Sequence, residues 1–221
     1  MANMTGGQAI VAQLKAEGVD TIFGIIGEST YSLYDALYDE PGIRHYTTRN
    51  ELGAASMADG YARVTGRPGV CFSTVGPGAA HTLSALGEAF AESSPVLHIT
   101  GQIEADLVGK DRGVYHESPD QLALFEPLTT WAFRATSVAD ISWAIHEAFR
   151  LFKTRRPQPV HIEVPRDIIA GTGDADILPP EEYEPARAET ADVRRAVQML
   201  LQAERPIVYS GGGVTRSGAG A

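Results

Sequence analysis

The chain has 221 residues, is 43% hydrophobic and carries a formal net charge of −10, which leaves room for one ordinary domain and part of a second. The acidic balance excludes the basic surface that nucleic acids require, and the single cysteine excludes a disulfide within the chain. No charged and apolar leader opens the sequence and no apolar run reaches about 18 residues, so we expect a cytoplasmic protein with no membrane partner.

Short apolar runs alternate with helical patterns along the first 167 residues. The first helix is expected over 5–18, because Ile10, Val11 and Leu14 have helical spacing between residues that suit the two caps. The expected strands are then 20–26, 43–48, 69–75, 95–100 and 159–164, and the expected helices are 31–38, 47–66, 81–92 and 138–153. This alternation predicts an α/β domain, a doubly wound parallel sheet with helices on both faces, that ends near Asp167.

The composition changes after the last of these strands. Residues 170–187 are rich in Pro, Glu and Gly and indicate a linker. Residues 188–221 then predict one helix, a short strand at 206–209 and a Gly-rich turn. Because one helix and one strand cannot bury a core, we expect the truncated start of a second α/β domain after a first domain over 1–169.

Two Gly-rich turns are candidates for ligand contact. SGGGVTRSGAG at 210–220 follows the expected last strand but matches the dinucleotide spacing poorly, which favours a plain tight turn over a phosphate site. STVGPGAAHT at 73–82 follows a buried strand and opens a helix, where backbone amides can face a ligand at the carboxyl edge of the sheet. A simple Gly-Pro change of direction explains this second turn equally well.

The histidines divide by their surroundings. His98 and His161 lie in apolar strands and His146 lies on a helix, so structural roles are favoured for all three. His116 lies in a long polar stretch of the kind that carries binding and catalytic residues. No pair has the spacing of metal ligands, so we expect no metal site, and Cys71 in its apolar run is interpreted as core packing rather than as a reactive thiol.

Glu51 opens a helix whose early turns carry small residues. An acid in the first turn is stabilised by the helix dipole, with Thr48 or Asn50 as the cap, and this structural account is favoured on physical grounds alone. The small residues that follow allow a second backbone or a flat ligand to come close. They are Gly53, Ala54, Ala55 and Ala58.

Four stretches share an order and spacing with a known family. They are FGIIGESTYSLYDAL, RNELGAASMADGYARVTG, VCFSTVGPGAAHTLSALGEAFAESSPVLHITGQ and RRPQPVHIEVPRDI. Together they resemble the pyrimidine-binding domain of thiamine diphosphate enzymes of the acetolactate synthase and pyruvate oxidase group. The resemblance covers residues 5–169, and the tail from residue 188 resembles the start of the central domain of that group.

The resemblance implies a catalytic role for Glu51. In the family, this acid hydrogen-bonds a ring nitrogen of the cofactor's aminopyrimidine and thereby promotes removal of the proton from the thiazolium carbon, which then adds to a 2-oxo acid. Such a relay requires Glu51 to sit in a dry site. The small residues beneath it would let the helix pack closely at the subunit interface where the cofactor lies.

Several positions depart from the family pattern in the first loop. GIIG stands where relatives often have Gly-x-Pro-Gly, so Ile26 replaces a proline near the pyrimidine, and Gly27 completes the loop. Glu28 takes a position that holds Asp in the pyruvate decarboxylase branch and Gly in acetolactate synthases. It either handles a proton or rejects acidic substrates, or else serves only as a loop carboxylate or helix cap.

Other departures lie in the second loop and beyond. Thr74, Pro77 and His81 match the segment that flanks the pyrimidine, with His81 where acetolactate synthases usually carry Asn. His116 stands near the place of a Gln that faces the intermediate. With Glu28, this favours a decarboxylase acting on a larger or cationic 2-oxo acid over the condensation of two pyruvates.

The resemblance also implies parts that this sequence does not contain. In the group, the diphosphate and Mg²⁺ are held by a carboxyl-terminal domain with a Gly-Asp-Gly…Asn motif, and the cofactor lies between subunits. We therefore expect thiamine diphosphate and Mg²⁺ as cofactors, a homodimer or homotetramer formed through the pyrimidine-binding domain, and a chain that is inactive alone. The alternative from another class is a non-catalytic α/β binding or assembly module, or a Rossmann-type nucleotide domain.

Overall fold

The computed structural model describes residues 2–184 and 187–219. The chain divides into two compact units, Met1–Glu182 and Tyr183–Ala221. None of the helices in the described ranges is both long and apolar enough to cross a membrane.

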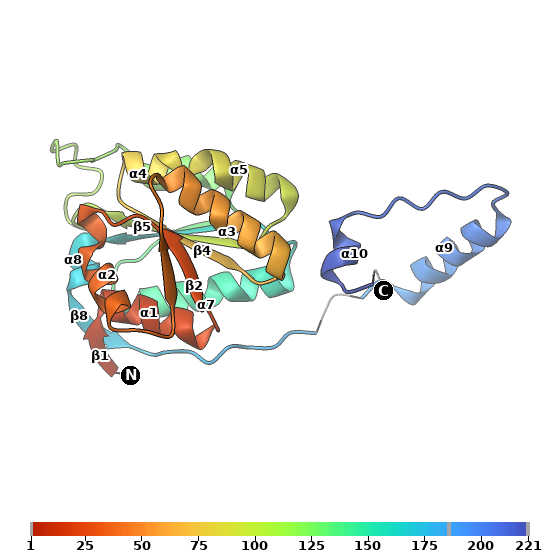
Figure 1. The fold of residues 1–221 in the computed structure, drawn as a ribbon, viewed down its shortest axis with the longest axis horizontal. Coiled ribbons are helices and arrows are strands. Elements are labelled where there is room, and N and C mark those ends of the chain that lie inside the picture. The colour runs from red at the N-terminus through yellow and green to blue at the C-terminus, as the bar shows by residue number, and fades with distance from the viewer. Residues whose placement is uncertain (1, 185–186, 220–221) are drawn as a thin grey trace. The chain divides into compact units, whose positions relative to one another are not determined.

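A six-stranded parallel sheet forms the centre of the first unit (Figure 1). Its strand order is β3-β2-β4-β5-β7-β6, and every neighbouring pair is parallel. The strands are β2 (Thr21–Gly24), β3 (Arg44–Thr47), β4 (Gly69–Ser73), β5 (Val96–Gln102), β6 (Trp131–Arg134) and β7 (Val160–Pro165). This confirms the predicted parallel sheet, although β6 was not predicted, because its four residues pair only at the edge of the sheet.

Helices cover both faces of the sheet, as the doubly wound prediction requires (Figure 1). One face carries α1 (Gly6–Ala16), α2 (Tyr31–Tyr38), α7 (Val138–Thr154) and α8 (Arg166–Ala170), and the other carries α3 (Glu51–Thr65), α4 (Pro77–His81), α5 (Leu83–Glu92) and α6 (Gln121–Phe125). Two 3-10 turns, η1 (Glu28–Thr30) and η2 (Glu126–Leu128), complete this unit. The helix expected over 81–92 is confirmed as α5, and the short helix α4, which was not predicted, ends at His81 just before it.

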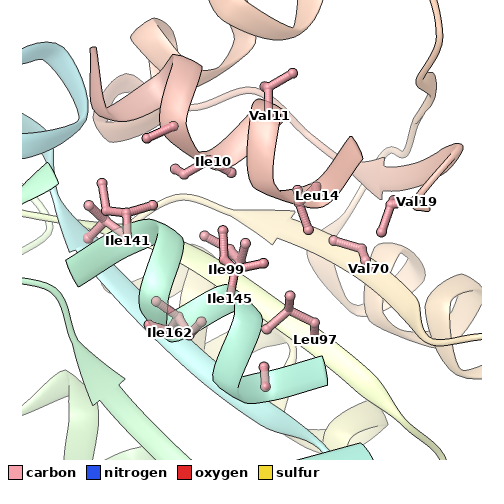
Figure 2. Close-up of a cluster of buried hydrophobic side chains, with 14 of the residues drawn as sticks. Ile10, Val11, Leu14, Val19, Val70, Leu97, Ile99, Ile141, Ile145 and Ile162 are labelled. Atoms are coloured by element: carbon pink, nitrogen blue, oxygen red, sulfur yellow. The ribbon is translucent and has the colours of Figure 1, made fainter. Parts of the chain in front are cut away.

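The larger core lies between the sheet, α1 and α7 (Figure 2). Ile10 and Leu14 from α1 and Ile141 from α7 are fully buried against the strands. Burying one such side chain stabilises the fold by about 1.5–3 kcal/mol. The helical spacing read from the sequence therefore corresponds to a continuous apolar layer that holds the two helices on the sheet.

The second core, under α3, is built from small side chains. Ala54, Ala55 and Ala58 are buried against this unit's own sheet, and a Cβ on Gly69 of β4 would lie 2.0 Å from the carbonyl oxygen of Ala58. The alanines therefore bring α3 close to β4, which corrects the expectation that they face a second subunit. Cys71 lies in the same core, which confirms its packing role, and burial raises the pKa of its thiol.

The segment expected as a linker from residue 170 is partly structured. Strand β8 (Thr172–Ala175) pairs antiparallel with β1 (Ala2–Thr5) in a separate two-stranded sheet. Further along, the buried Gln13 of α1 accepts a hydrogen bond from the backbone N–H of Leu178 at 2.8 Å and donates one to its carbonyl at 3.0 Å. The linker prediction is therefore wrong for these residues, because pairing between chain segments about 170 residues apart leaves no local periodicity.

The second unit contains α9 (Thr190–Gln202) and α10 (Gly212–Arg216). The helix expected after residue 188 is confirmed as α9. The strand expected at 206–209 is not formed, since these residues have neither helical nor strand structure. A strand needs a hydrogen-bonded neighbour, and the described residues of this unit provide none.

Candidate functional site

The candidate site lies at the carboxyl edge of the parallel sheet. The loop after β2, the start of α3 and the loop after β4 all leave the sheet at this edge, where ligand sites of open α/β folds are found. The backbone N–H of Thr48 donates to the carbonyl of Gly24 at 2.9 Å, so the chain before α3 is fixed to the end of β2. The edge therefore gathers side chains that are distant in sequence.

Glu51 is the first residue of α3. Asn50 caps this helix, because its side-chain oxygen accepts a hydrogen bond from the N–H of Leu52 at 2.8 Å, and so Asn50 rather than Thr48 is the cap. The Glu51 side chain is only 14% exposed, and its Oε2 lies 2.9 Å from Nδ1 of His81, which is 54% exposed. The Glu51 side chain therefore lies in the first turn of α3 with one oxygen against this imidazole.

The turn over residues 74–78, which we call the site turn, faces Glu51. Gly76 has φ +63° and ψ −115°, a conformation that favours glycine, and Pro77 follows at the start of α4. A Cβ on Gly78 would lie 2.6 Å from the Thr74 side chain and 3.1 Å from Oε1 of Glu51. The structure thus brings His81 into contact with Glu51 and places Thr74 and Glu51 both beside the backbone of Gly78, which follows Pro77.

The loop after β2 lies against the site turn. A Cβ on Gly27 would lie 2.4 Å from Cβ of Thr74, so no larger residue fits there. The neighbouring Ile26 leaves half of its apolar side chain exposed. Ser29, which the sequence did not single out, bonds Oγ1 of Thr74 at 2.9 Å through its hydroxyl. Gly27 and the site turn are therefore in contact.

Glu28 has different neighbours. Its carboxylate forms an ion pair with Arg166, which also pairs with Glu104. These three residues line an open cleft of about 410 Å³ between η1, α2 and α8. The hydrogen bond from Arg166 lowers the pKa of Glu104, against a smaller opposing effect of burial. The contacts of Glu28 are thus with this cleft rather than with the carboxylate of Glu51.

His116 approaches the site turn through its backbone. A Cβ on Gly76 would lie 2.1 Å from the carbonyl oxygen of His116, so the two segments touch. His116 has φ +65°, which is uncommon for a residue other than glycine, and its ring stacks on Tyr115 with centroids 3.8 Å apart. The polar stretch that carries His116 therefore borders the site, with the imidazole half exposed.

His98 and His161 are fully buried, which confirms their structural roles. Nε2 of His98 lies 2.8 Å from the hydroxyl of Ser73, and its Nδ1 lies 3.0 Å from Nδ1 of His161. Burial lowers the pKa of both histidines. His98 also lies beside His161, and His161 lies near the charges of Glu163 and Arg134. His146 is likewise structural, with Nδ1 2.7 Å from a carboxylate oxygen of Glu17.

No set of three or more His, Cys, Asp or Glu side chains in the described ranges is arranged to hold a metal ion. The residues around Glu51 instead suit a flat, neutral ring. They supply one carboxylate, one imidazole and glycine backbone that packs too closely against its neighbours to accept a side chain. The carboxylate and the exposed imidazole beside it are groups that can hydrogen-bond an aminopyrimidine such as that of thiamine diphosphate.

Comparison with known proteins identifies the class. Residues 4–124 match the family described as "Thiamine pyrophosphate enzyme, N-terminal TPP binding domain", which is more than half of the chain. The chain therefore belongs to the thiamine pyrophosphate enzymes and contains their N-terminal TPP-binding domain. This confirms the resemblance read from the four sequence stretches.

Particular relatives are similar over almost the whole chain. A probable 2-ketoarginine decarboxylase of Pseudomonas aeruginosa is 41% identical over 97% of the chain and 39% of its own length. A probable acetolactate synthase large subunit of Methanocaldococcus jannaschii is 40% identical over 98% of the chain and 37% of its own length. The acetolactate synthase isozyme 2 large subunit of Escherichia coli is 39% identical over 96% of the chain and 38% of its own length. The chain thus spans about two fifths of the length of these relatives.

Proposed function

We propose that the chain is the N-terminal part of a thiamine diphosphate-dependent 2-oxo acid decarboxylase or carboligase in which Glu51 activates the cofactor. The observation that carries this proposal is the mostly buried Glu51 carboxylate, which faces bare backbone at Gly78 on the carboxyl edge of the sheet. The family match and the enzymes among the relatives support it. Thiamine diphosphate, when bound, supplies the nucleophilic carbon and the electron sink for loss of carbon dioxide.

The chain's own residues would orient and protonate the pyrimidine end. Nδ1 of His81 lies against Oε2 of Glu51, which leaves Oε1 toward Gly78, and we assign Oε1 the hydrogen bond to the pyrimidine ring. Low exposure keeps water away from this carboxylate. Ile26, Gly27, Thr74 and Pro77 would form the walls around the ring, and Mg²⁺ and the diphosphate would be bound outside this chain.

The substrate is proposed to be a larger or cationic 2-oxo acid. The cleft is lined by three carboxylates, those of Glu28, Glu104 and Asp167, and by the guanidinium of Arg166. A relative is named a probable 2-ketoarginine decarboxylase. Identities of 41% and 40% to a decarboxylase and an acetolactate synthase do not separate the two reactions. We therefore base the choice on the acidic cleft and on His116 beside the site turn.

The protein is proposed to be a cytoplasmic homodimer or homotetramer. The outward side of α3 carries the exposed apolar side chains of Leu52, Met57 and Val64. Exposed apolar side chains on the helix that starts with Glu51 suit contact with a second copy near the site.

The decisive experiment replaces Glu51 by Gln in the full-length protein. Deuterium exchange at the thiazolium carbon of bound thiamine diphosphate, followed by NMR, is expected to slow by about 10²–10⁴-fold. Glu126→Gln, an exposed acid in η2, is the matched control and keeps the parent rate. Unchanged exchange in Glu51→Gln rejects the role of Glu51, and a full-length protein that binds no thiamine diphosphate supports the non-catalytic module.

The substrate is tested separately with a panel of 2-oxo acids. Release of carbon dioxide from a guanidino-substituted 2-oxo acid is expected to exceed release from pyruvate, and Glu28→Gln is expected to reduce that preference. Turnover of pyruvate alone, with acetolactate as product, contradicts the substrate proposal and leaves the role of Glu51 standing.

A further inference from the structure

The site turn is held by side chains from two other segments of the chain. Two of its buried backbone N–H groups have side-chain partners: Val75 donates to Oγ of Ser29 at 3.1 Å, and Gly76 donates to Oε1 of Gln121 at 2.6 Å. A buried N–H without a partner is costly, so each partner restricts where the turn can lie. Gln121 makes the shorter of the two contacts.

Gln121 is fully buried at the start of α6, and its whole amide is used. Its NH₂ group donates to the carbonyl of Gly101 at 3.2 Å and to Oε2 of Glu163 at 3.0 Å. Gly76 offers a donor and the other two partners offer acceptors, so only one orientation of the amide satisfies all three contacts.

Glu163 anchors this amide inside the sheet. It is fully buried on β7, forms an ion pair with Arg134 of β6 and accepts a weaker hydrogen bond from Gln102 at 3.4 Å. Burial alone would raise the pKa of Glu163, but His161 and the positive charge of Arg134 outweigh burial and lower that pKa. Glu163 is therefore an ionised acceptor that fixes the NH₂ side of Gln121.

We propose that Gln121 is a positioning residue. It links the buried Glu163–Arg134 pair to the site turn and so sets the distance between Gly78 and Glu51. The geometry supports this because a Cβ on Gly78 would already lie 3.1 Å from Oε1 of Glu51. A small displacement of the turn thus opens or closes the space in front of the carboxylate. This inference rests on the proposed function, in which Oε1 binds the cofactor ring.

The first test needs no cofactor. In the full-length protein, Gln121→Met keeps the size of the side chain and removes its hydrogen bonds, and the matched control is Gln102→Met. Gln102 is also buried and bonds the same Glu163, but its oxygen accepts from Ile103 instead of from the site turn. Hydrogen exchange of the peptide that contains Gly76 is expected to quicken by about tenfold or more in Gln121→Met only. Equal exchange in both variants overturns the inference.

The second test separates positioning from packing. In Gln121→Glu, a protonated carboxyl donates toward Glu163 and accepts from Gly76, whereas an ionised carboxyl repels Glu163. The rate of exchange at the thiazolium carbon, relative to the unaltered enzyme, is therefore expected to rise as the pH falls. Gln121→Met is expected to slow this exchange by about 10- to 100-fold at every pH. If the exchange rate of Gln121→Glu, divided by that of the unaltered enzyme, does not depend on pH, the inference is contradicted.

The outcomes also separate this inference from the proposed function. Normal cofactor exchange in Gln121→Met, with loss of exchange in Glu51→Gln, rejects the inference and leaves the proposed function intact. A full-length protein that binds no thiamine diphosphate rejects both, whatever the hydrogen exchange of the site turn shows.

Discussion

Gly76 has a backbone conformation and surroundings that only glycine satisfies. Its φ of +63° is unfavourable for other residues, and the carbonyl oxygen of His116 occupies the space of a Cβ. The left-handed region costs an L-residue about 1–2 kcal/mol, and the collision adds to this cost. The residue therefore fixes both the site turn and the segment that carries His116.

We predict that Gly76→Ala lowers the free energy of unfolding by more than about 2 kcal/mol. Gly113→Ala is the matched control, because Gly113 has φ +68° with nothing within 4 Å of an added Cβ, so that it reports the backbone cost alone. Urea denaturation measures both variants. An equal loss in both would mean that contact with His116 adds nothing.

The buried pair of His98 and His161 predicts a dependence of stability on pH. Burial lowers the pKa of both imidazoles below 6.5, with Glu163 and Arg134 next to His161. Below pH 6.5 the unfolded chain binds protons that the folded chain does not. The contribution of these residues to stability is therefore complete above about pH 6.5 and falls by up to about 1.4 kcal/mol per pH unit for each histidine below it.

Urea denaturation between pH 8 and pH 5 checks this prediction. His98→Gln is expected to reduce the slope below pH 6.5, since Gln does not titrate, while His116→Gln in the half-exposed loop serves as the control. A slope that is the same in the parent and in His98→Gln would show that the buried imidazole does not govern acid sensitivity.

At the level of elements, α1 holds the segment that follows β8. The side chain of Gln13 forms two hydrogen bonds with the backbone of Leu178, one in each direction. This pairing extends the first unit past the last strand of the large sheet, to Glu182. A single buried side chain therefore replaces the strand partner that an extended segment otherwise requires.

We predict that Gln13→Ala frees residues 176–182 at a cost of about 1–3 kcal/mol, because both backbone groups of Leu178 lose their partner. Limited proteolysis of this segment is expected to quicken, with the sheet left intact by circular dichroism. Gln158→Ala removes only one hydrogen bond, 3.4 Å long, to Phe90 and serves as the control. Unchanged cleavage in Gln13→Ala contradicts this account.

At the scale of the whole molecule, the chain holds one end of a proposed cofactor site. The residues around Glu51 suit a neutral ring, and the described ranges contain no carboxylate and histidine cluster for a metal ion. Charged contacts to a diphosphate each contribute about 1.5–3 kcal/mol, so most of the affinity for thiamine diphosphate is expected to come from outside this chain.

We predict that the 221-residue chain alone binds thiamine diphosphate and Mg²⁺ at least about 100-fold more weakly than the full-length protein, and that it does not turn over pyruvate. Isothermal titration calorimetry of both forms measures the difference. Tight, Mg²⁺-dependent binding by the chain alone contradicts the prediction and would place the diphosphate site within these residues.

The sequence predicted the large sheet well because its strands are local apolar runs between amphipathic helices. Buried β4, β5 and β7 and the apolar sides of α1 and α7 all have such periodicity. The sequence analysis missed β6 and β8 and predicted a strand at 206–209 that does not form. In each case, the presence or absence of a partner strand elsewhere in the chain decides whether a strand forms. The family resemblance pointed to Glu51, Thr74, Pro77 and His81, and in the structure His81 contacts Glu51 while Thr74 and Glu51 both lie beside Gly78.

By itself, the sequence determined the doubly wound sheet, the family and the position of Glu51 at the start of a helix, since periodicity, caps and motif spacing are local properties. Only the tertiary structure decided that the alanines of α3 face its own sheet, that Glu28 pairs with Arg166 and that Gln121 binds Gly76. The last two contacts join residues 138 and 45 positions apart. They depend on how the strands are ordered, which no local pattern contains.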